Sequence, residues 1–133
     1  MFVDASALTA ILTDENDARD LVGRLKWAKR RITSPLAVWE ATIAVARRLG
    51  LPLREARDAI RDYLSLAGIE VVPVPPEVGD GAIDAFERYG KGRHPASLNF
   101  GDCFAYACAR HYGATLLFKG DDFTRTDIAS KST

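Results

Sequence analysis

Five acidic residues spread along this 133-residue chain are placed where carboxylates can act together: Asp4, Glu40, Asp102, Asp121 and Asp122. Like charges gathered in one place repel and raise one another's pKa unless a cation neutralises them. All-oxygen ligands favour a hard cation such as Mg²⁺ or Mn²⁺. Because Mg²⁺ keeps several waters, it suits a site that activates water against a phosphodiester. The residue types therefore predict metal-assisted phosphodiester hydrolysis, provided that the fold brings them together.

The histidines and cysteines do not indicate a zinc site. His94 and His111 are the only histidines, and neither has ligand spacing with a cysteine. Cys103 and Cys108 lie five residues apart in one expected helix, so they face different directions and cannot easily pair. Reduced thiols of this kind are typical of the cytoplasm.

Alternating apolar stretches and helical patterns predict the elements that must position the carboxylates. We expect strands at 1–3, 31–34, 69–74 and 114–118. Helical periodicity and terminal Pro and Gly residues predict helices at 5–12, 14–28, 35–50, 52–68, 76–90 and 100–113.

This alternation predicts an α/β fold: a three-layer α/β/α sandwich around a mostly parallel sheet of four to five strands. The length fits a single domain over residues 1–133. Sites in such sheets form beyond the carboxyl ends of the strands. Asp4 follows the first strand, Glu40 lies in the helix after the second, and Asp102 begins the helix before the fourth. Asp121 and Asp122 follow that fourth strand, so all five are expected at one edge.

Composition narrows the classes of function. Lys and Arg together number 18, as do Asp and Glu together, which argues against binding nucleic acid by bulk positive charge. No apolar run approaches the ~20 residues needed to cross a bilayer, and the N-terminus does not resemble a signal segment. We therefore expect a protein of the cytoplasm without a membrane partner.

Each acidic residue also has a purely structural explanation. Asp4 can cap a helix, as can Ser6. Asn99 and Asp102 have the spacing of an N-cap and its N3 acid, and Asn99 could instead contact the substrate backbone. In the sequence KGDDF, Asp121 and Asp122 can be turn residues. Only the combination favours a catalytic site.

The motifs that carry these residues resemble a known family. VDAS at 3–6, Glu40 after the second strand, LNFGDCFAYACA at 98–109 and LLFKGDDFTRTDI at 116–128 closely resemble the PIN-domain ribonucleases of the VapC type, the toxins of VapBC toxin–antitoxin pairs. The resemblance covers the whole chain, and its last two motifs are the most specific.

This resemblance implies a Mg²⁺-dependent endoribonuclease with a PIN-like fold, homodimeric and silenced by a VapB-type antitoxin. Carried over by position, Asp4, Glu40 and Asp102 match the family's three firm acidic positions, and Asp121 is favoured over Asp122 as the fourth. Asp4 and Asp102 would hold the metal most directly, with Glu40 and Asp121 holding its waters or a second ion. Ser6 matches a hydroxyl position that supports the first carboxylate.

Other functions remain open on the sequence. The main alternative is a non-catalytic interaction module whose acidic rim binds a basic partner segment. A phosphatase of the haloacid-dehalogenase type would need an acid at the position of Ser6, and a receiver-like domain would need one after its middle strand. An RNA substrate would be single-stranded and guided by local basic residues, for which segments 24–31 and 91–99 are candidates.

Overall fold

The computed structural model describes residues 1–128 and contains a parallel sheet of four strands. The strands are β1 (Phe2–Val3), β2 (Arg31–Thr33), β3 (Ile69–Val71) and β4 (Leu116–Leu117), in the order β3-β2-β1-β4. Phe2 pairs with Ile32 on one side and with Leu116 on the other. The parallel sheet expected from the sequence is confirmed, at the lower end of the expected strand number.

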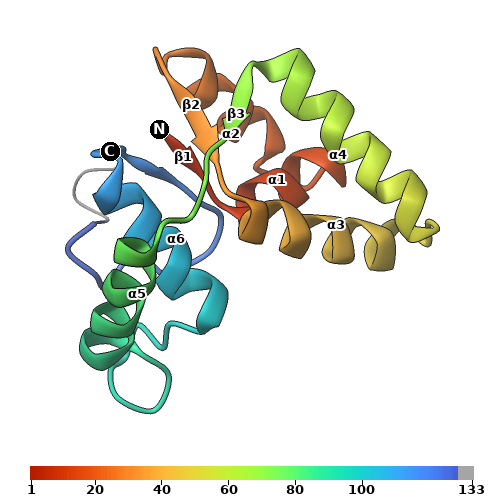
Figure 1. Cartoon of the computed structure of the whole chain (residues 1–133). Helices are drawn as coiled ribbons and strands as arrows, with labels where there is room; N and C mark the ends of the chain where they lie inside the picture. The colour runs from red at the N-terminus through yellow and green to blue at the C-terminus, as the bar shows by residue number, and fades with distance from the viewer. Residues whose placement is uncertain (129–133) are drawn as a thin grey trace.

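Helices cover both faces of this sheet and complete the three layers (Figure 1). One side carries α5 (Pro76–Tyr89) and α6 (Phe100–His111), which pack against each other. The other side carries α1 (Ala5–Leu12), α2 (Ala18–Lys26), α3 (Pro35–Leu49) and α4 (Leu53–Ala67). The expected α/β/α arrangement is therefore confirmed. Within residues 1–128, no helix has the length and apolar character required to span a membrane.

The long helices begin and end where the sequence punctuation predicts. Ser34 caps α3 by accepting a hydrogen bond from the Ala37 N–H at 3.1 Å, and Pro35 occupies the first turn. Gly50 and Gly68 end α3 and α4 in the left-handed region, with φ of 63° and 65°. Glycine adopts this conformation without a Cβ penalty, so the α3–α4 hairpin is encoded locally.

Several expected elements are shorter than the sequence indicated. The strand expected at 114–118 covers only Leu116–Leu117. The helix expected at 14–28 covers only Ala18–Lys26, because the chain turns at Asp14, whose φ is 52°. The strand expected at 69–74 ends at Val71. Val72 still donates its N–H to the Thr33 carbonyl at 2.8 Å, but Pro73 has no N–H with which to continue the ladder.

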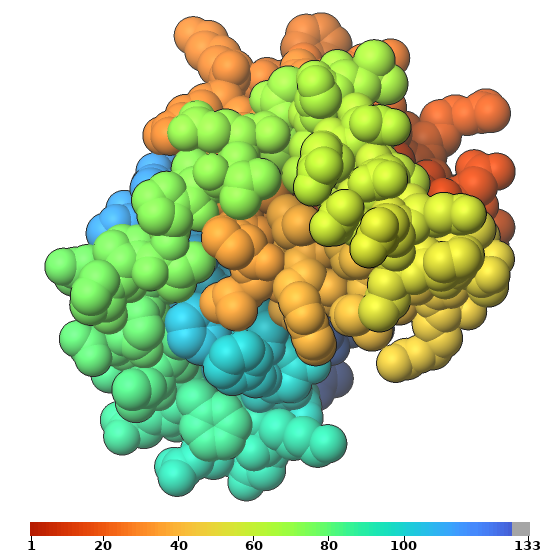
Figure 2. Space-filling model, turned by 45° about the vertical axis from the view of Figure 1, so that its right-hand side comes forward, coloured from red at the N-terminus to blue at the C-terminus, as the bar shows by residue number. Residues whose placement is uncertain are grey.

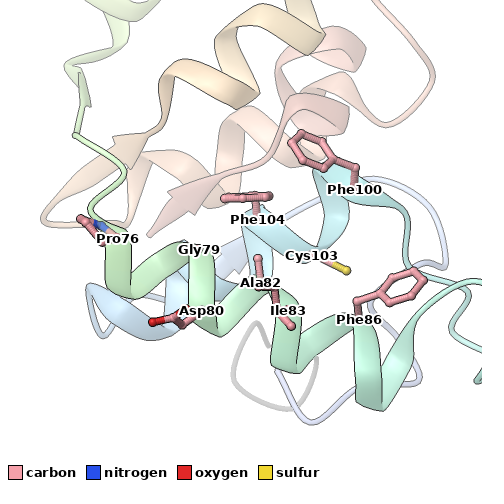
Figure 3. Close-up of a pocket in the computed structure, with 9 residues that line it drawn as sticks. All are labelled: Pro76, Gly79, Asp80, Ala82, Ile83, Phe86, Phe100, Cys103 and Phe104. Atoms are coloured by element: carbon pink, nitrogen blue, oxygen red, sulfur yellow. The ribbon is translucent and has the colours of Figure 1, made fainter.

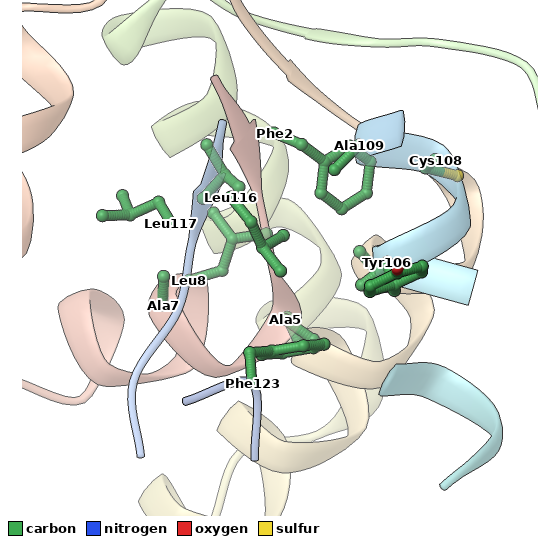
Figure 4. Packing of buried hydrophobic residues seen from close by; sticks show 14 of the residues in the cluster. Phe2, Ala5, Ala7, Leu8, Tyr106, Cys108, Ala109, Leu116, Leu117 and Phe123 are labelled. Carbon is green, nitrogen blue, oxygen red and sulfur yellow. The ribbon is translucent and has the colours of Figure 1, made fainter. Parts of the chain in front are cut away.

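The core lies between the sheet and the two helical layers (Figure 4). The ring of Phe2 points toward Ala109 of α6, whereas Leu117 lies on the side of Leu8 in α1. These side chains are fully buried, as expected for a sheet covered on both faces. Because both faces of β1 and β4 are packed, these strands have a fixed position in the core. The residues that follow them, including Asp4, are therefore fixed as well.

A close approach of α5 and α6 explains a glycine that weakened the helical pattern. A Cβ at Gly81 would lie 3.3 Å from the Cβ of Ala107 in α6, tighter than ordinary contact. The small residue therefore allows the two helices to pack closely, which compensates for its poor helix propensity.

Candidate active site

A cavity of about 390 Å³ lies beyond the carboxyl ends of β1 and β4 and contains three of the acidic residues expected at the site, Asp4, Glu40 and Asp102. It is also lined by Ser6. The remaining lining residues are Ala5, Thr9, Glu15, Ala44, Arg48, Lys119 and Gly120. Three carboxylates from three distant parts of the chain therefore share one space, as the strand topology predicted.

Asp4 caps the N-terminus of α1 and also lines this cavity. Its backbone is extended, and its Oδ2 accepts hydrogen bonds from the Ser6 N–H at 3.1 Å and the Ser6 hydroxyl at 2.5 Å. Its backbone N–H bonds to the Leu117 carbonyl at 2.9 Å, which ties it to the end of β4. The capping explanation is thus correct for Asp4. Both hydrogen bonds from Ser6 end on Oδ2, and neither ends on Oδ1.

Ser6 connects Asp4 to the segment after β4. Its Oγ accepts a hydrogen bond from the Lys119 N–H at 3.0 Å while donating to Asp4. The hydroxyl therefore fixes the carboxylate of Asp4 relative to the chain that leads to Asp121 and Asp122. This contact agrees with the supporting position given to Ser6 by its place in VDAS.

Glu40 reaches the cavity because residue 101 has no side chain. A Cβ at Gly101 would fall well inside contact distance of both Glu40 carboxylate oxygens and of its Cδ. Gly101 lies in the first turn of α6, next to Asp102, and α3 packs against α6. In Figure 2 the start of α3 (orange) and α6 (cyan) lie side by side on the surface, beside α5 (green).

Asp102 and Asn99 form a reciprocal capping box at the start of α6. The Asn99 Oδ1 accepts from the Asp102 N–H at 2.9 Å, and the Asp102 Oδ2 accepts from the Asn99 N–H at 3.1 Å. The capping explanation is again correct. It orients the Asp102 carboxyl while directing it into the cavity, where it is buried.

Burial, together with repulsion from nearby carboxylates, raises the pKa of all three carboxyls. For Asp4, burial is the main cause and the charge of Asp122 adds to it. Burial, followed by the charge of Asp4, raises the pKa of Glu40 to about 7. Burial also raises the pKa of Asp102 to about 7, with added repulsion from Asp122, Asp4 and Glu40. The chain thus places three carboxyls where ionising them together is costly.

The fourth acid expected from the sequence lies in the KGDDF segment, but neither Asp121 nor Asp122 lines this cavity. Both candidates are exposed, and the Asp121 carbonyl accepts hydrogen bonds from the N–H and hydroxyl of Thr124 in a turn. Of the two, Asp122 is the one whose charge raises the pKa of Asp4 and of Asp102. Asp122 therefore acts on the cavity through its charge, whereas the sequence favoured Asp121.

The carboxylate oxygens of the cavity are the type of ligand that a hard cation prefers, but they do not surround a single point. Within residues 1–128 no group of three or more His, Cys, Asp and Glu side chains is placed so that together they could hold a metal ion. Mg²⁺ needs no such set, because it usually takes one or two carboxylates and keeps its waters. Oxygen donors with raised pKa in one cavity are consistent with that demand.

Three residues of the cavity were not expected from the sequence: Glu15, Arg48 and Lys119. Glu15 accepts from Arg48 at 2.6 Å and from Lys119 at 2.8 Å. No motif spacing could reveal this, since the residues come from a loop, the end of α3 and the segment after β4.

The basic segment 24–31 lies elsewhere. It leads into β2, whose first residue is Arg31, so it approaches the amino edge of the sheet rather than the carboxyl edge. The other basic segment, 91–99, ends at the Asn99 cap beside Asp102.

Comparisons with known proteins agree with this fold and show the family. A family model described as PIN domain matches residues 1–129. The chain is 44% identical over 130 residues to Ribonuclease VapC of Mycolicibacterium smegmatis, covering 98% of both. It is 40% identical over 130 residues to Ribonuclease VapC30 of Mycobacterium tuberculosis, covering 98% of this chain and 97% of the relative. The crystal structure of M. tuberculosis VapC20, a sarcin-ricin loop cleaving toxin, matches with a TM-score of 0.71 at 22% identity, over 92% of each chain.

Gly101→Ala tests whether Glu40 needs the empty space at residue 101. The added methyl group should displace the Glu40 carboxylate, since its end is movable, and leave the fold intact. We expect a loss of cation-dependent stabilisation and of RNA cleavage without a lower melting temperature. Gly23→Ala in α2 is the matched control, because nothing lies within 4 Å of that position. It should leave cleavage unchanged and stabilise α2 by up to ~1 kcal/mol.

The raised pKa of Glu40 predicts a pH dependence of stability in the metal-free protein. A carboxyl with a folded pKa of about 7 and an ordinary value of 4.5 binds its proton more tightly in the folded state. Its stabilising effect is therefore full below pH 4.5 and is lost as pH rises toward 7. Urea unfolding in EDTA should show wild type losing stability relative to Glu40→Gln over this window. A constant difference between the two proteins would contradict the raised pKa.

Proposed function

This chain belongs to the PIN-domain family and, within it, to the VapC ribonucleases, and from that premise we propose that it is a Mg²⁺-dependent endoribonuclease toxin. We propose further that it cleaves exposed RNA and is neutralised by a VapB-type antitoxin. The observation that carries the proposal is the shared cavity of Asp4, Glu40 and Asp102, with pKa values raised by burial and repulsion.

We assign roles according to burial and contacts. Asp4 and Asp102 are buried and oriented by their capping bonds, so they would hold the cation most directly. Glu40 and an acid of the KGDDF segment would hold its waters, and we propose Asp122 for that acid in place of Asp121. A bound Mg²⁺ would supply charge neutralisation and a water of lowered pKa. Ser6 would keep the Asp4 carboxylate in place throughout.

The substrate is proposed to be single-stranded or looped RNA. The cavity lies beyond the carboxyl edge of the sheet, and part of its lining comes from the loop residue Glu15 and from Lys119 and Gly120 after β4, so an extended backbone can reach it. The groove of an A-form helix would present its phosphates less readily to such a site. The sarcin-ricin loop named for VapC20 is a target of that protein.

The antitoxin is proposed to place an arginine among the carboxylates. A guanidinium pairs with carboxylates in a bidentate manner and would replace the cation as the neutralising charge. We place this toxin in the cytoplasm, a location supported by two free, buried cysteines among the described residues.

An apolar groove between α5 and α6 supports self-association (Figure 3). Ile83 and Phe86 of α5 and Phe100 of α6 line it, and Ile83 and Phe100 remain 69% and 68% exposed. The groove has a volume of about 620 Å³, and within residues 1–128 Asp80 is the only charged residue that lines it. We propose that a second copy of the chain covers this groove in a two-fold homodimer.

The alternative function is a non-catalytic module that binds a basic segment at the acidic cavity. Such a module would also be neutralised by an arginine, so binding alone cannot separate the two. Cleavage of RNA by the purified chain that stops with EDTA would favour the nuclease.

Asp4→Asn tests the proposed function most simply. Asparagine keeps the shape and caps helices well, so the fold should remain intact. Removing one of the repelling charges should leave the metal-free protein as stable as wild type or more so. RNA cleavage should fall below detection. Wild type should gain about 2.7 kcal/mol at a Mg²⁺ concentration of a hundred times its Kd, and the variant should lose most of that gain.

Asp20→Asn makes the same chemical change on the exposed face of α2 and serves as the control. It should cut RNA and respond to Mg²⁺ like wild type in the same thermal melts. If Asp4→Asn also cut RNA at a near wild-type rate, Asp4 would be a cap alone.

Ile83→Glu tests the proposed homodimer. A charge at the centre of the groove would be buried in the interface, so the dimer should dissociate to monomer in sedimentation at micromolar concentration. Leu66→Glu is the control, because Leu66 on α4 is 85% exposed and does not line the groove. A dimer that survives Ile83→Glu, or that Leu66→Glu disrupts, would place the interface elsewhere.

A further inference from the structure

We propose that Arg48 and Lys119 form a binding subsite for a backbone phosphate of the RNA, next to the phosphate that is cleaved. The inference rests on the proposed ribonuclease function and assigns two residues that bring the substrate to the carboxylates. In this role Arg48 and Lys119 take the place of the basic segment 24–31, because that segment leads to the other edge of the sheet.

Arg48 and Lys119 are held together by a single oxygen. The Glu15 Oε1 accepts a hydrogen bond from Arg48 Nη1 at 2.6 Å and from Lys119 Nζ at 2.8 Å. The Lys119 ammonium also lies 3.5 Å from Asp17 Oδ1. Glu15 and Asp17 belong to the turn between α1 and α2, so this turn brings together the end of α3 and the segment after β4.

This cluster shares the cavity of the proposed catalytic carboxylates. Glu15, Arg48 and Lys119 line the same 390 Å³ space as Asp4, Glu40 and Asp102. Lys119 is also joined to Asp4 through its backbone, since its N–H bonds to the Ser6 hydroxyl that donates to Asp4. The position of one cation is therefore coupled to the carboxylate that would hold the metal.

The two cations are fixed in place yet open to solvent. The side chain of Arg48 is 52% exposed and that of Lys119 is 34% exposed, whereas Glu15 is 22% exposed. Ion pairs of this exposure contribute little to stability. They do limit the rotamers of two long side chains, which reduces the entropy lost when a ligand binds.

The chemistry of these donors suits a phosphodiester. A guanidinium carries five N–H donors and an ammonium three, so both retain donors beyond those given to Glu15. RNA that approaches three carboxylates is repelled, and cations in the same cavity offset that repulsion. Other cations near the sheet are engaged elsewhere: Arg31 donates to the Ala67 carbonyl, and Arg110 pairs with Asp127.

The salt dependence of RNA binding tests the subsite without relying on catalysis. The parent protein is Glu40→Gln in Mg²⁺, which should bind without cutting, and the probe is a short fluorescein-labelled single-stranded RNA followed by anisotropy. For single strands, log K falls with log salt with a slope of about −0.7 per phosphate contact. Adding Arg48→Gln or Lys119→Gln should each make the slope less negative by about 0.7.

Arg47→Gln is the matched control, because Arg47 is the exposed neighbour of Arg48 in the last turn of α3 and does not line the cavity. It should leave the slope unchanged. If the parent binds RNA and wild type cuts it, but both test variants keep the parent's slope, the subsite is overturned and the proposed function stands. If Arg48→Gln and Lys119→Gln lower the melting temperature but leave the salt slope of RNA binding unchanged, the subsite is likewise overturned. The ion pairs with Glu15 would then only stabilise the turn between α1 and α2. Wild type that neither binds nor cuts the RNA would overturn the subsite and the proposed function together.

Discussion

Three carboxyls held in one cavity are the constraint on which the site depends. Burial is the main cause that raises the pKa of Asp4, Glu40 and Asp102. The charge of Asp4 adds to it at Glu40, and the charges of Asp122, Asp4 and Glu40 add to it at Asp102, so the fold must hold these carboxyls against a force that separates them. Ordinary packing and hydrogen bonding provide that hold. The parallel pairing of β1 and β4 places Asp4, and the contact of α3 with α6 places Glu40 over Gly101.

The same bonds serve both the fold and the chemistry. Asp4 caps α1 and Asp102 completes a capping box at α6, so each carboxylate is oriented by backbone N–H groups that a helix must satisfy in any case. A purely structural and a catalytic explanation are therefore compatible for these residues. The observation that favours the catalytic explanation is that Asp4 and Asp102 share one cavity with Glu40. Helix capping alone does not require this arrangement.

The positions of Asp4 and Asp102 could be predicted because they depend on topology. Features that depend on contacts between side chains could not be predicted. Asp4 and Asp102 could be placed because strand order and helix direction determine which end of each element meets the site edge. The role of Gly101 could not be foreseen, because it depends on the distance between α3 and α6. The Glu15 cluster was missed for a similar reason, and the sequence had assigned residues 14–17 to a helix that begins at Ala18. Asp122 gained weight over Asp121 only from its electrostatic effect on Asp4 and Asp102.

The central claim is that a cation relieves the repulsion of carboxyls whose pKa is raised. Its most direct test is the number of protons released when Mg²⁺ binds, measured by titration calorimetry in buffers of different ionisation enthalpy. Because Glu40 and Asp102 have a pKa of about 7, Mg²⁺ binding near that pH should release protons, and the release should vanish at alkaline pH where both are already ionised. Mg²⁺ binding with no proton release near pH 7, or no binding at all, would contradict the account.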